Sequence, residues 1–96
     1  MAVSRLSADA ALDRLKWSVE LAGLKNGLNP TFTTPDKFVT GTIRLYWNGQ
    51  RLLEGGSIDF ITSESGGAGT GFDTITFIGR APRLGDNLLA DYVVDL

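Results

Sequence analysis

The first third of the chain places apolar residues at helical spacing. Over residues 8–22 they recur three and four positions apart, which predicts an amphipathic α-helix. Ser7 suits the N-cap because its hydroxyl can accept a hydrogen bond from a free amide of the first turn. Gly23 suits the position after the last turn, because glycine adopts left-handed backbone angles at no steric cost.

The predicted helix carries two apolar faces, whereas a helix that lies on its own domain needs only one. The first face holds alanine, leucine and valine at positions 8, 12, 15, 19 and 22. The nearly opposite face holds Trp17 and Leu21 and continues to Leu24. This second face either wraps around the same core, is covered by residues 26–36, or packs on another subunit, and the sequence leaves these alternatives open.

Strand and turn signals follow. Residues 26–36 contain Asn-Gly, Asn-Pro and Thr-Pro pairs, which are typical of turns and extended backbone, and we expect Phe32 to anchor this connecting segment to an apolar surface. From residue 37 apolar and polar positions alternate with a period of two, which predicts strands. Asn48-Gly49 predicts a two-residue hairpin turn, because a type I′ turn needs positive φ at both positions. Strands are expected over residues 42–47, 50–53, 58–63, 73–78 and 87–94.

The chain is therefore predicted to be mainly β, a small antiparallel β-sandwich or barrel with one N-terminal amphipathic α-helix. Its 96 residues suit one compact core. We expect a helical arm over residues 1–29, a connector over 30–36 and a β-sandwich domain over 37–96.

The composition excludes several classes of site. The chain has no cysteine and no histidine, which removes disulfides, thiolate nucleophiles, imidazole metal sites and the Ser-His-Asp triad. A net charge of −2 gives no basis for nucleic-acid binding, which usually needs a basic patch. No stretch approaches the roughly 18 apolar residues of a membrane span. We expect neither nucleic acid nor a membrane as a partner.

Two groups of residues are candidates for ligand binding. The glycine-rich loop at residues 65–71 lacks the third glycine of a dinucleotide fingerprint, where Phe72 stands, and it lacks the lysine of a P-loop. Asp59, Glu64 and Asp73 flank this loop, but their spacing matches no EF-hand, and a small domain leaves little room for the cleft of a glycosidase. We expect no catalytic residue, metal or cofactor.

The aromatic residues of the hairpin point in different directions. Tyr46 and Trp47 are adjacent on one predicted strand, so they face opposite sides and cannot form a single stacking platform. Trp47 is expected in the core. Arg51 should lie opposite Tyr46, where a cation–π contact is feasible.

The order of these turns resembles a pattern common in tailed-phage virion proteins. Its parts are Asn48-Gly49, a Leu-to-Gly segment over 52–55, Asp59-Phe60, an Ile-x-Phe strand over 75–77, Pro82, Gly85-Asp86 and a last strand ending in Tyr92. Such modules occur near the attachment end of tail fibres and in neck and head decoration proteins. The resemblance covers roughly residues 42–94. Extra residues before Asp59 and the long glycine-rich loop depart from it.

The resemblance implies assembly and attachment, and it brings no catalytic residues. We therefore expect a non-enzymatic structural subunit of the virion, made in the host cytoplasm and placed at the fibre attachment, the neck or the capsid surface. Its expected partners are copies of itself, as a homo-oligomer, and other virion proteins. The predicted interface consists of Trp17, Leu21, Leu24 and Phe32. The alternative is a glycan- or host-receptor-binding β module, which requires aromatic side chains exposed on one flat surface.

Overall fold

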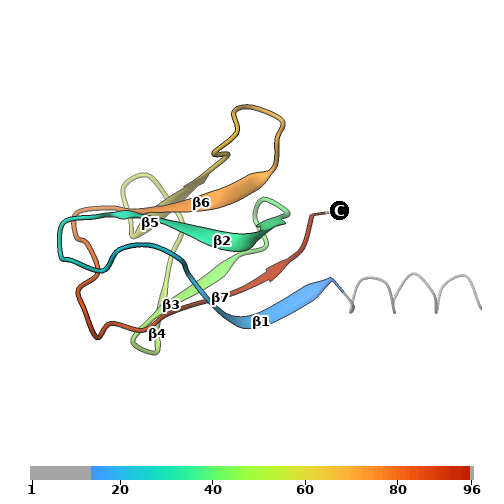
Figure 1. The fold of residues 1–96 in the computed structure, drawn as a ribbon. Helices are drawn as coiled ribbons and strands as arrows, with labels where there is room; N and C mark the ends of the chain where they lie inside the picture. The colour runs from blue at the N-terminus through green and yellow to red at the C-terminus, as the bar shows by residue number, and fades with distance from the viewer. Residues whose placement is uncertain (1–13, 96) are drawn as a thin grey trace, which may run out of the picture.

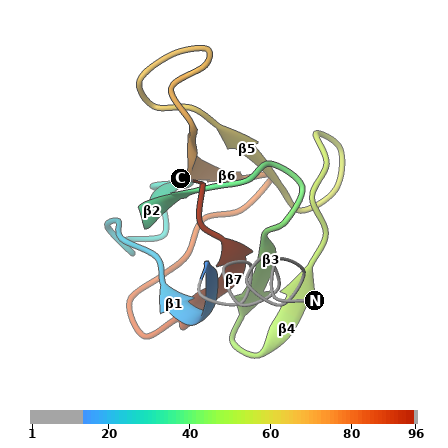
Figure 2. The same cartoon turned by 90° about the vertical axis from the view of Figure 1, so that its right-hand side faces the viewer.

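The computed structural model describes residues 14–95, which form two antiparallel sheets. The four-stranded sheet has the order β1 (Leu15–Glu20), β7 (Leu88–Val93), β3 (Arg44–Trp47) and β4 (Gln50–Leu52). The three-stranded sheet has the order β2 (Thr31–Phe38), β6 (Phe72–Phe77) and β5 (Phe60–Ser63). Figure 1 and Figure 2 show the two sheets as separate layers. The prediction of a mainly β, antiparallel fold is confirmed.

The core lies between the two layers and is closed by aromatic contacts across them. Phe38 of β2 packs on Tyr92 of β7 with ring centroids 5.7 Å apart, and Trp47 of β3 meets the edge of Phe77 of β6 at 5.0 Å. Phe32 lies against the same Phe77 ring at 5.7 Å. Such offset and edge-on pairs add to the burial of the rings themselves. The rest of the core cluster within residues 14–95 consists of Leu21, Ile43, Leu45, Leu52, Phe60, Ile75, Leu88 and Ala90.

The predicted N-terminal helix is wrong from residue 14 onward. Leu15–Glu20 form strand β1, which pairs with β7, and the backbone of Ala22 bridges to Thr33 of β2. Residues 16–21 alternate polar and apolar side chains as well as showing helical spacing, so the periodicity alone was ambiguous. Pairing with a distant strand decides the conformation. Ser7 and residues 8–13 lie outside the described part of the chain.

The segment expected to be a connector is itself a strand. Residues 31–38 form β2 at an edge of its sheet, and Pro35 lies where the register with β6 shifts. An edge strand tolerates proline at such an irregularity because the missing amide interrupts no ladder. The anchoring role expected of Phe32 is confirmed, since its side chain is buried in the core.

The hairpin at residues 44–52 forms as predicted. Asn48 has φ of 51° and Gly49 has φ of 84°, as a type I′ turn requires. Trp47 pairs with Gln50, and Tyr46 pairs with Arg51. No helix within residues 14–95 is long and apolar enough to cross a membrane.

Candidate functional site

The structure separates the four residues predicted to form an interface. Leu21 and Phe32 are 3% and 1% exposed and belong to the core of this domain. Trp17 and Leu24 are each 66% exposed, but they lie on different elements, one on β1 and the other in the loop that follows it. Only two of the four residues therefore lie on the described surface.

A β-bulge determines which way the side chains of β1 point. Its register with β7 shifts between Lys16 and Val19, and Ser18 has a left-handed φ of 52°. In an unbroken strand, Trp17 and Val19 would face the same side, because alternate residues share a face. The extra residue turns Val19 toward the core and leaves Trp17 on the outer face.

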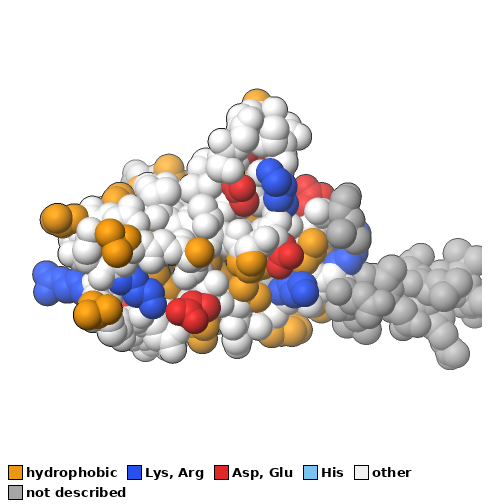
Figure 3. Space-filling model, in the orientation of Figure 1, with side chains coloured by type: hydrophobic (Ala, Val, Ile, Leu, Met, Phe, Trp, Pro, Cys, Tyr) orange, Lys and Arg blue, Asp and Glu red, His pale blue; other side chains and the backbone are white. Residues whose placement is uncertain are grey.

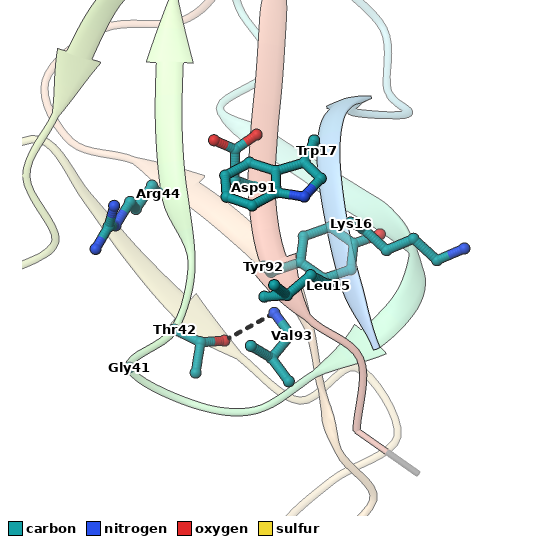
Figure 4. Close-up of a pocket in the computed structure, with 9 residues that line it drawn as sticks. All are labelled: Leu15, Lys16, Trp17, Gly41, Thr42, Arg44, Asp91, Tyr92 and Val93. Atoms are coloured by element: carbon teal, nitrogen blue, oxygen red, sulfur yellow. Dashed lines mark hydrogen bonds between the residues drawn. The ribbon is translucent and has the colours of Figure 1, made fainter. Parts of the chain in front are cut away.

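Asp91 of β7 holds this bulge in place. Its Oδ1 accepts a hydrogen bond of 2.7 Å from the backbone amide of Ser18. Asp91 also pairs with Arg44 of β3, which places both side chains on the same outer face. Figure 4 shows the Trp17 indole lying beside Asp91, with Arg44 on the neighbouring strand.

Two shallow hollows meet at Asp91 on this outer face. The first has a volume of about 270 Å³ and is lined by Leu15, Trp17, Thr42, Arg44 and Val93 among others. The second has a volume of about 310 Å³ and brings in Tyr46 and Leu89. The Thr42 hydroxyl donates to Val39 O at 2.6 Å and accepts from the Val93 amide at 3.3 Å. These hydrogen bonds hold Thr42 in place where it lines the first hollow.

A second surface feature lies at one end of the two layers. We call it the leucine end, and it consists of Leu24, Leu28 and Leu84, which are 66%, 84% and 93% exposed. The two loops that carry these residues are joined by a hydrogen bond of 2.8 Å from the Gly27 amide to Pro82 O. The space-filling view shows apolar side chains projecting from the end of the molecule that lies away from the grey atoms (Figure 3).

Asp86 connects the leucine end to the hairpin turn. Its Oδ2 accepts from the Arg83 amide at 2.8 Å, and its Oδ1 accepts from the Asn48 side chain at 3.0 Å. These hydrogen bonds, the one from Arg83 first, hold the pKa of Asp86 below its ordinary value. The Asn48 side chain in turn accepts from the Asn87 amide at 2.7 Å. Two turns far apart in the sequence are therefore tied together.

Each of the three acids considered as a metal or glycosidase site accepts hydrogen bonds that hold a loop in place. Asp59 accepts from the Leu53 amide, and Glu64 accepts from the Gly71 amide, both at 2.8 Å. Asp73 accepts from the hydroxyl and the amide of Ser65 at 2.6 and 3.0 Å. Burial raises the pKa of Asp73, but these bonds, a further one from the Thr74 hydroxyl and the charge of a nearby lysine outweigh it and lower the pKa. Within residues 14–95 no cluster of acids is suited to hold a metal ion.

The cation–π contact of the structure involves a different pair from the expected one. Arg80 lies over the Trp47 ring, 4.4 Å from its centroid. Trp47 packs against the core as predicted. Tyr46 and Arg51 are opposite each other, also as predicted. The guanidinium of Arg80 therefore covers the edge of the core at the loop that leads to the leucine end.

Comparison with protein-family models, with curated proteins and with solved structures finds no match to this chain.

The outer-face residues that sequence reasoning missed are Ser18 and Asp91. The alternation over residues 16–21 was the available signal that β1 is a strand. The bulge itself left no local signal, because it depends on the carboxylate of Asp91 in a strand far along the chain.

Proposed function

We propose that the protein is a non-enzymatic structural subunit of a tailed-phage virion, which assembles with copies of itself and with other virion proteins. The fibre attachment, the neck and the capsid surface are the places where such modules occur. The observation that carries the proposal is the leucine end, a rigid set of exposed apolar loop tips. Exposed apolar clusters of this kind commonly mark protein interfaces.

The hydrogen bonds behind these loops support an assembly role. Asn48 and Asp86 are two separate parts of the turn pattern that resembles virion modules, and their side chains bond to each other. At the tip of the neighbouring loop, Asn26 Oδ1 accepts from the amides of Leu28 and Asn29 at 2.9 Å each. A rigid surface loses little conformational entropy when it docks, which favours its use as a contact.

The sheet edges are poorly suited to assembly by strand addition. The bulge at Ser18 interrupts β1, and Pro35 lies within β2. The other two edge strands, β4 and β5, have three and four residues. Short, bulged or proline-bearing edges are ways in which proteins prevent sheet-to-sheet pairing. Assembly therefore rests on side-chain contacts at the leucine end.

Light scattering after size exclusion, over a series of protein concentrations, tests this proposal. The wild-type chain should form a discrete oligomer, and the double variant Leu28→Ser/Leu84→Ser should shift toward monomer with an unchanged circular dichroism spectrum. Leu53→Ser is the matched control, because Leu53 is also exposed, at 55%, but follows β4. A wild-type monomer at every concentration, or a double variant with the wild-type mass, would contradict self-assembly through this surface.

A further inference from the structure

The outer face of the four-stranded sheet exposes an indole to solvent, and the backbone next to this indole is strained. Trp17 is 66% exposed, and the next residue, Ser18, adopts φ of 52°, which non-glycine residues rarely do. Strain of this kind is concentrated at functional sites. The bulge allows Val19 to enter the core while Trp17 stays outside. The strand thus presents an aromatic side chain that plays no part in the core.

Hydrogen-bonding groups surround this indole and have unused capacity. Asp91 Oδ1 holds the Ser18 amide, whereas Asp91 Oδ2 has no hydrogen-bond partner among residues 14–95. Arg44 pairs with Asp91 in register, is exposed, and forms no ion pair with any described residue. In the view of Figure 4 its side chain extends away from the indole, and Arg44 lines the same hollow as Trp17. One acceptor beside the exposed indole and one cluster of donors thus line the same hollow.

This combination fits a neutral sugar better than other ligand classes. A pyranose ring has a face of C–H groups, which packs against the electron-rich face of an indole. Its hydroxyl groups both donate and accept, so they can satisfy a carboxylate and a guanidinium together. A phosphate would be repelled by Asp91, and a cation would be repelled by Arg44. An extended peptide would need a regular strand edge, which the bulge at Ser18 interrupts.

The size and arrangement of the hollows indicate more than one sugar unit. The hollow beside Trp17, at about 270 Å³, is close to the lower limit for small-ligand sites. The adjoining hollow of about 310 Å³ lies across Asp91 and is lined by Tyr46. Trp17 and Tyr46 therefore share one face of the sheet, where Tyr46 and its neighbour Trp47 could not. We infer that this face binds a neutral oligosaccharide, with Trp17 as the stacking platform and Asp91 and Arg44 as the hydrogen-bonding pair. The inference does not depend on the proposed assembly role.

Indole N–H signals in a ¹H–¹⁵N correlation spectrum of the full chain provide the test. The chain has two tryptophans, so the spectrum contains an internal control in Trp47, which packs against Phe77 and Arg80. Trp17→Phe assigns the two signals. The titrants are glucose, galactose, mannose, rhamnose and N-acetylglucosamine, followed by oligosaccharides of each. The Trp17 signal should shift saturably with at least one series, more strongly for the oligosaccharide, while the Trp47 signal stays in place.

Matched variants distinguish a specific binding site from nonspecific binding. Trp17→Ala should abolish binding, and Asp91→Asn, which can still accept from the Ser18 amide, should raise the Kd roughly tenfold. Arg44→Gln should have a similar effect, whereas Arg83→Gln, an exposed arginine at the leucine end and outside both hollows, should leave the Kd unchanged. No saturable shift of Trp17 with any saccharide would overturn the inference. Equal effects of Arg44→Gln and Arg83→Gln would overturn it as well.

Discussion

Replacing Asn48 tests whether its side-chain hydrogen bonds to residues 86 and 87 stabilise the fold in addition to the conformation of the hairpin turn. In the structure the Asn48 side chain accepts from the Asn87 amide at 2.7 Å and donates to Asp86 at 3.0 Å. Its backbone has φ of 51°, which asparagine and glycine tolerate better than other residues. Asn48→Gly removes both side-chain bonds but keeps the backbone angle accessible. Asn48→Ala removes the bonds and also disfavours the angle.

The expected magnitudes follow from these contacts. A net contribution of about 0.5–1.5 kcal/mol per hydrogen bond, with both bonds exposed, gives a loss of about 1–2 kcal/mol for Asn48→Gly. Asn48→Ala should lose about 1–2 kcal/mol more, because the left-handed conformation is unfavourable for residues with a Cβ. For a domain of this size each kcal/mol lowers Tm by about 4–8 °C. Asn48→Gly should therefore melt roughly 5–15 °C below the wild type.

Thermal unfolding followed by circular dichroism measures these differences, with Asn48→Asp as the discriminating variant. An aspartate still accepts from the Asn87 amide, but it places a second carboxylate beside Asp86. Its loss of Tm at neutral pH should shrink in high salt, because screening weakens the repulsion of exposed charges. A stabilising role for these hydrogen bonds is refuted if Asn48→Gly melts at the wild-type temperature, or if salt leaves the loss of Tm of Asn48→Asp unchanged. In that case the side-chain hydrogen bonds of Asn48 contribute nothing, and only the turn conformation matters.

Three further predictions concern the core and the titrating groups. Phe32→Ala should lower the free energy of unfolding in urea by about 3–5 kcal/mol, whereas Leu24→Ala should change it by less than about 0.5 kcal/mol, and equal effects would place Phe32 at the surface. The pKa values of Asp73 and Asp86 lie below the ordinary 3.8, so their stabilising contribution should be complete above that pH and lost as the pH falls below it, measured as urea midpoints against pH. Burial and then Asp36 raise the pKa of Tyr92 above its ordinary 10.0, so stability should decline as the pH rises beyond 10.0, and ultraviolet titration should show a phenol that ionises only on unfolding.

The parts of the fold that sequence predicted are those fixed by local chemistry. Asn48-Gly49 specifies its own turn, and the alternation on either side specifies the strands and their register. The core role of Trp47 followed from the same alternation. These features need no knowledge of distant residues.

The parts that sequence missed depend on contacts between distant segments. Residues 16–21 satisfy both a helical and a strand pattern, and the pairing of β1 with β7 decides between them. The surplus apolar face of the predicted helix placed Leu21 and Phe32 at an interface, but Leu21, which follows β1, and Phe32 of β2 both complete the core. The site around Trp17 depends on a bulge held by Asp91, and no local pattern encodes a register shift against a strand so far away.

The composition of purified phage particles tests the central claim most directly. Tailed particles would be collected from cells infected with the phage whose genome encodes this chain. They would be separated on a density gradient and analysed by mass spectrometry. Peptides of this protein should sediment with the tailed particles, in fixed proportion to the major virion proteins, and should resist a salt wash. Peptides found only in the unsedimented fraction would contradict a structural role in the virion.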